Sequence, residues 1–230
     1  MIRKKEFFFQ KRKKLFGMGV LIGWILLLVI FLLVLAARRT PGFYRQWMSV
    51  PREKKLDRND SAVRKSLNLY SHFQTQDTPW QLMLTEEEMN AWLSTSAVNG
   101  KESLFTKEFH SPCLRIQGNV IELVAMTEYG NWKGAVHLKF SVTVAEPNQF
   151  VLRLRSAKLG VYPLSRKTVL RLLTETLDRK KIRYQNVNES GDVAVKVMWD
   201  IPAPKGKKIL AESVKTETGQ ILIEGTIEKG

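Results

Sequence analysis

Cysteine and histidine are scarce in this sequence of 230 residues, which contains one cysteine and three histidines. A single thiol, Cys113, excludes an internal disulfide framework and a zinc module built on several thiolates. Three histidines leave little material for a metal site made of imidazoles. The common nucleophile, zinc-protease, phosphate-loop and dithiol motifs are absent as well. We therefore assign no catalytic, cofactor-binding or metal-binding residue, and we expect a protein that is not an enzyme.

Acidic residues are in the minority, with 22 Asp and Glu against 37 Lys and Arg, which gives a formal net charge of +15. The excess is uneven, because residues 1–50 carry ten basic and one acidic side chain, whereas residues 51–230 carry 27 and 21. Basic segments beside a membrane-spanning helix commonly face anionic lipid. Since most of the excess flanks the apolar run described next, we expect no nucleic-acid partner.

Charge is missing altogether from residues 17–37, a run of 21 mostly apolar residues. A helix of that length reaches about 31 Å, which matches the hydrocarbon core of a bilayer. A soluble core helix would show a polar face, and this run has none. We predict a transmembrane helix. A cleaved signal peptide is the alternative, but its apolar region would be shorter and would not run directly into Arg38 and Arg39.

The charges on either side of this run predict its orientation. Residues 1–16 hold seven basic side chains against the single Glu6. By the positive-inside rule they form a basic cytoplasmic tail, and the chain after the helix is exported to the periplasm or the cell exterior. We therefore expect a single-pass protein of the cell membrane. Gly19 and Gly23 form a G-x-x-x-G pair, so they are candidates for helix dimerisation.

Residues 38–58 contain two prolines and many polar side chains, and we interpret them as a juxtamembrane stalk. Phe43, Tyr44 and Trp47 fit an aromatic belt at the membrane surface. We expect one exported domain over residues 59–230.

Two helices are predicted at the start of this domain. Asp60 and Ser61 suit the N-terminus of the first, which would run to about residue 73. Its buried stripe would consist of Val63, Leu67 and Tyr70. The second begins at the capping box of Thr85 and Glu88, and its buried face would be Met89, Trp92 and Leu93. Capping explains the run of three glutamates better than a catalytic or calcium site does.

From residue 114 the apolar period changes to two, which indicates strands. A turn at Gly118 and Asn119 joins the first pair, and residues 135–144 alternate strictly between apolar and polar side chains. A turn over 146–149, a strand over 150–159, a helix capped by Ser165, a strand over 193–199 and a hairpin at Gly219 follow. The fold class is therefore α+β, with a transmembrane helix and one exported domain of curved antiparallel sheet packed on helices.

The helix after residue 165 carries a cluster of basic side chains. Residues 166–183 hold seven basic and two acidic residues, a net +5. One interpretation is the solvated face of a core helix, and the other is a surface that meets anionic lipid or an acidic partner. The candidate surface consists of Arg166, Lys167, Arg171, Arg179, Lys180 and Lys181.

Two segments carry a resemblance to a known family. LMLTEEEMNAWL contains Thr85, Glu88, Asn90 and Leu93 at the start of a helix, and residues 151–173 contain a strand, a turn and a helix with Leu159, Gly160, Pro163 and Leu164. Their order resembles that of anchored bacterial envelope proteins of the YpmS-like type over most of residues 80–180. The resemblance implies a TULIP-like, lipid-binding fold, in which a curved sheet wraps a long helix over an apolar groove.

We therefore expect a membrane-anchored envelope protein, not an enzyme, whose exported domain binds an apolar ligand, namely lipid, or a membrane-associated partner. The alternative is an assembly or scaffold subunit that binds other envelope proteins and has no ligand. The sequence does not decide between an open groove and a closed core. The candidate groove residues are Trp92, Leu93, Val169, Leu172 and Leu173.

Overall fold

The computed structural model describes residues 40–98, 109–129, 132–189 and 192–229, together with residues 28 and 32. Apart from those two positions, the predicted transmembrane helix over 17–37 lies outside the described residues, and so do Gly19 and Gly23. Within the described ranges, no helix is long and apolar enough to span a membrane.

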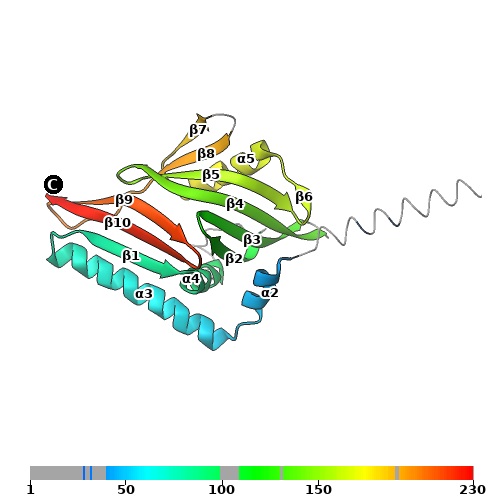
Figure 1. The fold of residues 1–230 in the computed structure, drawn as a ribbon, viewed down its shortest axis with the longest axis horizontal. Coiled ribbons are helices and arrows are strands. Elements are labelled where there is room, and N and C mark those ends of the chain that lie inside the picture. The colour runs from blue at the N-terminus through cyan, green and yellow to red at the C-terminus, as the bar shows by residue number, and fades with distance from the viewer. Residues whose placement is uncertain are drawn as a thin grey trace, which may run out of the picture.

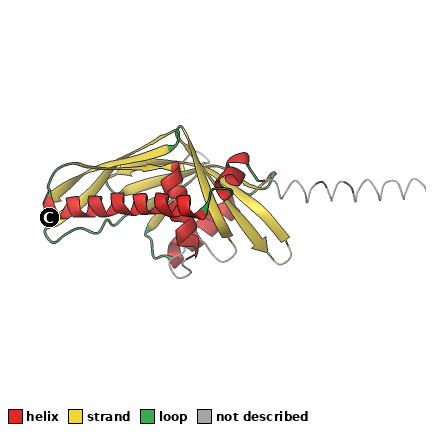
Figure 2. Cartoon of the chain, turned by 90° about the horizontal axis from the view of Figure 1, so that it is seen from below, coloured by secondary structure: helices red, strands yellow, loops and turns green. Residues whose placement is uncertain are grey.

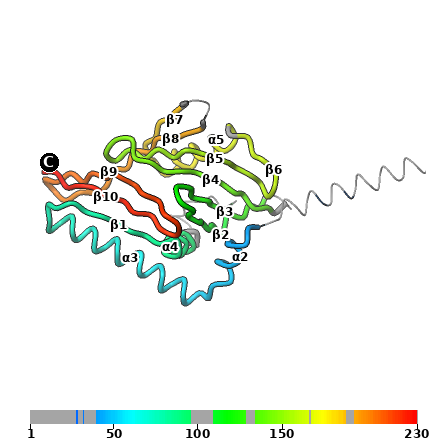
Figure 3. Tube along the Cα trace, in the orientation of Figure 1, coloured from blue at the N-terminus to red at the C-terminus, as the bar shows by residue number. Residues whose placement is uncertain are grey.

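The described residues have an α+β fold of antiparallel strands packed on helices, as the sequence predicts, but the strands form two sheets and not one. The smaller sheet has the strand order β1-β10-β9, and Figure 3 shows β1 beside β10, with the β9–β10 hairpin turning next to α4. It joins a segment near residue 80 to the C-terminal hairpin. Its strands are β1 (Trp80–Thr85), β9 (Lys207–Glu217) and β10 (Gln220–Lys229).

The larger sheet has seven strands in the order β2-β3-β4-β5-β8-β7, with the short β6 paired to β5. Strands β2 to β5 follow one another as hairpins, whereas β8 crosses back to pair with β5. The strands are β2 (Phe109–Gln117), β3 (Val120–Tyr129), β4 (Trp132–Glu146), β5 (Gln149–Leu159), β6 (Tyr162–Pro163), β7 (Tyr184–Glu189) and β8 (Asp192–Met198).

Four described helices pack around these sheets. The long α3 runs beside β1 and crosses the lower side of the molecule (Figures 1 and 2), and α4 packs between α3 and β2. Helix α5 lies against the face of the larger sheet that carries Leu123, Leu138 and Phe140, which we call the inner face. The helices are α2 (Gly42–Met48), α3 (Arg52–Thr75), α4 (Glu86–Val98) and α5 (Arg166–Arg179).

The interpretation of residues 38–58 as a polar stalk is wrong for the described part of that segment. Pro41 and Pro51 are the N-cap residues of α2 and α3, positions where the missing N–H costs nothing and the fixed φ suits a helix start. Tyr44 and Trp47 are 6% and 7% exposed in a core cluster, so they are not an aromatic belt at a membrane surface. Residues from 42 onward therefore belong to the folded domain.

The first predicted helix is longer than expected, and it is rotated. It begins at Arg52, and Ser61 does not cap it but donates a hydrogen bond of 2.7 Å to Glu88 Oε1. Val63, Leu67 and Tyr70, the predicted buried stripe, are 42%, 61% and 48% exposed. The buried positions are instead those that face α4 and β1.

Most of the remaining local predictions are confirmed. Thr85 N–H donates to Glu88 Oε2 at 2.9 Å and Glu88 N–H donates to Thr85 Oγ1 at 3.3 Å, which completes the capping box. Gly118 has a left-handed φ of 56° in the β2–β3 turn, and Gly219 lies in the β9–β10 turn. The turn over 146–149 also joins β4 to β5.

Candidate ligand cavity

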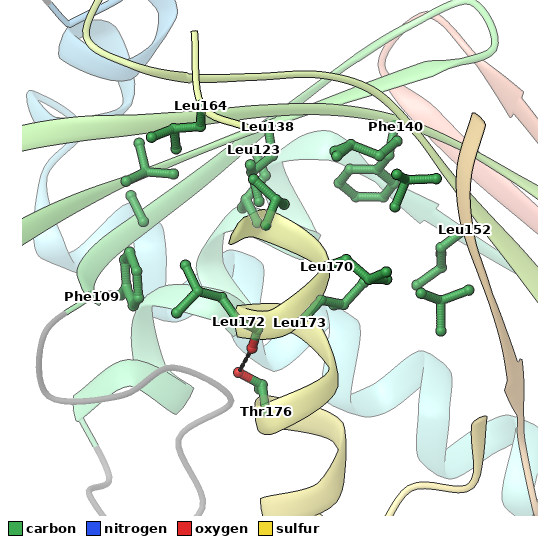
Figure 4. Close-up of a pocket in the computed structure, with 16 residues that line it drawn as sticks. Phe109, Leu123, Leu138, Phe140, Leu152, Leu164, Leu170, Leu172, Leu173 and Thr176 are labelled. Atoms are coloured by element: carbon green, nitrogen blue, oxygen red, sulfur yellow. Dashed lines mark hydrogen bonds between the residues drawn. The ribbon is translucent and has the colours of Figure 1, made fainter. Parts of the chain in front are cut away.

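An apolar cavity of about 250 Å³ separates α5 from the inner face of the larger sheet. Figure 4 shows Leu170, Leu172 and Leu173 extending from α5 toward the side chains of the strands. Five strands supply the facing wall, which consists of Phe109, Leu123, Ala125, Val136, Leu138, Phe140, Leu152, Leu154, Val193 and Val195.

Strict alternation along β4 builds the floor of this cavity. Val136, Leu138 and Phe140 point toward α5, while the residues between them point to the other face of the sheet. The register carries this division to the next strand, because Leu123 pairs with Leu138. Ala125, two residues further along β3, has only a methyl group to fill its share of the space, so room remains under the helix.

Helix α5 is fixed at both ends. Ser165 Oγ accepts a hydrogen bond of 3.1 Å from Thr168 N–H, and Leu164 N–H donates to Ala157 O of β5 at 2.9 Å. Near the ends of the helix Val169 and Leu177 are 6% and 8% exposed. The leucines between these two points face the cavity and are only partly buried.

Among the residues that the structure describes, Thr176 is the one polar side chain that lines this cavity. Its Oγ1 donates to Leu172 O within the same helix at 2.8 Å, so the hydroxyl proton is already used (Figure 4). The described part of the wall therefore offers a ligand no charge and no free hydroxyl proton. Such a surface binds apolar groups through the hydrophobic effect.

A second cavity, of about 480 Å³, lies at the C-terminal end of α5. Leu152 lines both cavities, so they are neighbours along the helix. Apolar side chains of β4, β5, β8, β9 and β10 form most of its wall. Trp199, which directly follows β8, also lines it, and its ring centroid is 5.5 Å from that of Phe150. Its charged lining residues are Lys181, Arg183 and Asp200.

The structure brings together three of the five predicted groove residues, because Val169, Leu172 and Leu173 line the first cavity. Trp92 and Leu93 lie elsewhere. Trp92 is 45% exposed on the outer side of α4, and Leu93 is 7% exposed in the core between the two sheets. The reason is the rotation of α4, which directs Asn90 and Leu93 inward and Trp92 toward solvent.

The basic residues after position 165 lie along the outer side of α5 and at its C-terminal end. Lys167, Arg179 and Lys181 are exposed, and Lys180 is half-buried. Arg171 is 70% exposed and forms an i,i+4 ion pair of 3.7 Å with Glu175. The side chain of Arg166 lies outside the described residues.

Sequence reasoning missed the strand residues of the cavity, such as Phe109, Val193 and Val195. The alternation over 135–144 predicts an apolar inner face, but it does not say which strands lie beside β4. Strand β8 reaches the cavity by pairing with β5 across about forty residues of chain. No local pattern in the sequence carries that pairing.

The single thiol is not placed for chemistry. Cys113 is fully buried, and burial raises the pKa of its thiol to about 12, with a smaller contribution from Glu86. A thiol with such a pKa is protonated at neutral pH and is a poor nucleophile. Among the residues that the structure describes, no three His, Cys, Asp or Glu side chains gather as a metal site requires.

Comparison with known proteins returns no relative. No family model, no curated protein and no solved structure matches this chain.

Proposed function

We propose that this is a membrane-anchored envelope protein, not an enzyme, whose exported domain binds the acyl chain of a lipid between α5 and the larger sheet. Residues 17–37 anchor it, with the N-terminus in the cytoplasm. The observation that carries the proposal is the composition of the first cavity, whose described lining residues include one polar side chain, with its hydroxyl proton already bonded.

The size of the available space supports this ligand class. Ligand pockets usually measure about 300–1,000 Å³. The first cavity, of about 250 Å³, lies just below this range, and its neighbour adds about 480 Å³. A closed core would fill such a volume with side chains, since protein interiors pack about as densely as organic crystals. An apolar chain that enters from a membrane would instead fill it in the bound state.

A second candidate function is a scaffold subunit that binds other envelope proteins and has no ligand. It is favoured by the apolar side chains on the outer side of α3, which are 42–61% exposed. Four exposed apolar residues on one helix suit a contact with another protein. They are Leu56, Val63, Leu67 and Tyr70.

Native mass spectrometry of the full-length chain, extracted from cell membranes with a detergent that is released in the gas phase, separates the two functions. The lipid proposal expects one additional mass per chain that organic extraction recovers as an acyl lipid. A chain that carries no additional mass, and that takes up none of a set of added long-chain lipids, contradicts it and favours the scaffold.

A further inference from the structure

The described charged residues that line the two cavities lie at one end. Lys181, Arg183 and Asp200 line the cavity at the C-terminal end of α5, whereas no charged side chain in the described part of the chain lines the cavity beneath α5. Since the two spaces are neighbours through Leu152, together they have a polar end and an apolar end. That arrangement matches an amphiphile, which has a polar head group and an apolar chain.

Basic groups predominate at the polar end. Residues 178–183 and Asp200 include four basic side chains, from Arg179, Lys180, Lys181 and Arg183, against two acidic ones. Asp178 accepts a hydrogen bond of 3.2 Å from Tyr184 Oη, and Asp200 pairs with Arg183. The basic side chains outnumber the acidic ones by two, so the net charge at this end is positive and favours an anion.

Two of these side chains are available to an anion. The ion pair with Asp200 uses Nη2 of Arg183, and a guanidinium has five N–H donors in total. Lys181 is exposed, and no described residue pairs with its ammonium group. It lies in the turn that ends α5, with a left-handed φ of 56°, at the edge of the second cavity.

We propose that the ligand is an anionic amphiphile with one long acyl chain, bound in a fixed direction. Its head group lies at Lys181 and Arg183, and its chain passes Leu152 and ends beneath α5. This inference rests on the proposed function and adds two properties to it, the charge of the head group and the direction of the chain. The 14 residues of α5 extend about 21 Å, a length that a long acyl chain can follow.

Photolabelling tests the direction. Two fatty acids, one with a diazirine near the carboxylate and one with a diazirine near the methyl end, are irradiated with the full-length chain in amphipol, and the labelled peptides are sequenced. We expect the first probe to label residues near Ile182 and Trp199, and the second to label residues near Leu123 and Leu172. The reversed pattern, or the same pattern for both probes, would overturn the inference.

Charge removal tests the head group. Lys181→Gln keeps the Cβ atom, so the cost of the left-handed backbone is unchanged and only the charge is lost. Lys167→Gln removes the same charge from the opposite end of α5 and is the matched control. For an exposed ion pair we expect Lys181→Gln to weaken fatty-acid binding about fivefold, or about 1 kcal/mol. Binding of the uncharged methyl ester should not change.

Competition in the photolabelling experiment identifies the head group and keeps this inference separate from the proposed function. Displacement of the probe by a fatty acid or by an anionic single-chain phospholipid supports an anionic ligand and shows whether carboxylate or phosphate is preferred. Displacement by the methyl ester at equal concentration, with no effect of Lys181→Gln, would refute the charge inference while the lipid proposal stands. If neither probe labels residues of either cavity, the lipid proposal itself is refuted.

Discussion

The side-chain amide of Asn90 binds both backbone polar groups of Leu114. Its Nδ2 donates to Leu114 O at 2.8 Å, and Leu114 N–H donates to its Oδ1 at 2.6 Å. Because β2 is the edge strand of the larger sheet, the amide takes the place of one residue of a neighbouring strand. Asn90 is 2% exposed, so this pair fixes α4 to the sheet at a buried position.

Replacing Asn90 by Ala should destabilise the fold by about 2–4 kcal/mol, because it leaves a buried donor and a buried acceptor without partners. Urea unfolding of the full-length chain in detergent, followed by tryptophan fluorescence, measures the change. Asn68→Ala on the exposed side of α3 is the control and should remain within about 0.5 kcal/mol of the wild type. Equal stabilities of the two variants would contradict the role given to the amide.

Glu88 should make the stability of the domain depend on pH. Burial alone would raise the pKa of this carboxyl, but hydrogen bonds from Lys65, Thr85 N–H and Ser61 outweigh it and hold the pKa at about 2. The depressed value means that the ionised form stabilises the fold fully above about pH 4.5. That contribution is lost as the pH falls toward 2.

The test is to replace Glu88 by Gln and compare unfolding free energies at several pH values. At pH 7 we expect a loss of roughly 2–3 kcal/mol. The difference from the wild type should shrink steadily below pH 4.5. Glu87→Gln, at a position where the side chain is 60% exposed, is the control and should show little pH dependence. A difference for Glu88→Gln that is constant from pH 7 to pH 3 would disprove the linkage.

Asn148 joins the tip of the β4–β5 hairpin to the smaller sheet. Its Nδ2 donates to Ile209 O at 2.7 Å, its Oδ1 accepts from Ala211 N–H at 2.6 Å, and its φ is 63°. Asn148→Gly removes only the side-chain bonds, whereas Asn148→Ala also strains the left-handed backbone. We expect Asn148→Ala to lower the free energy of unfolding in urea by about 1 kcal/mol more than Asn148→Gly does. The opposite ranking would show that backbone conformation is not part of the cost.

Gly225 is required by the close approach of β10 to its two neighbours. A Cβ atom there would overlap the carbonyl oxygen of Leu210 and lie 2.7 Å from Cζ2 of Trp80. Gly225→Ala should therefore lower the free energy of unfolding by about 3 kcal/mol or more. Thermal unfolding should show this loss as a lowered midpoint. Gly42→Ala, where a Cβ atom meets nothing within 4 Å, should be close to neutral. Similar midpoints for the two variants would contradict the packing described for β10.

Short-range features of the fold were predictable from the sequence because their causes are local. The capping box of Thr85 and Glu88, the Ser165 cap and the alternation over 135–144 each depend on residues within one turn or one strand. Strand β1 was not predicted, because Trp80–Thr85 pairs with β10 about 140 residues later and its last residues also suit a helix start. The rotation of α3 was not predictable either, since apolar side chains occur on more than one of its sides.

The candidate site was predictable to a similar extent. The leucines of α5 are recognisable because their spacing places them on one side of a helix, and Val169, Leu172 and Leu173 do line the cavity. Trp92 and Leu93 are the incorrect members, because the contact of Asn90 with the sheet edge sets the rotation of α4. Whether α5 closes on the sheet or leaves a space depends on strand pairings that no segment of the sequence encodes alone.

A pair of matched variants tests most directly whether a lipid chain occupies the space under α5. Leu173→Trp places an indole in the cavity, whereas Arg171→Trp places the same group on the exposed outer side of the same helix. The measurement is the amount of lipid per chain, from native mass spectrometry and extraction of both full-length variants and the wild type. We predict about one lipid for the wild type and for Arg171→Trp, and almost none for Leu173→Trp. Equal lipid content in all three proteins would contradict lipid binding in this space.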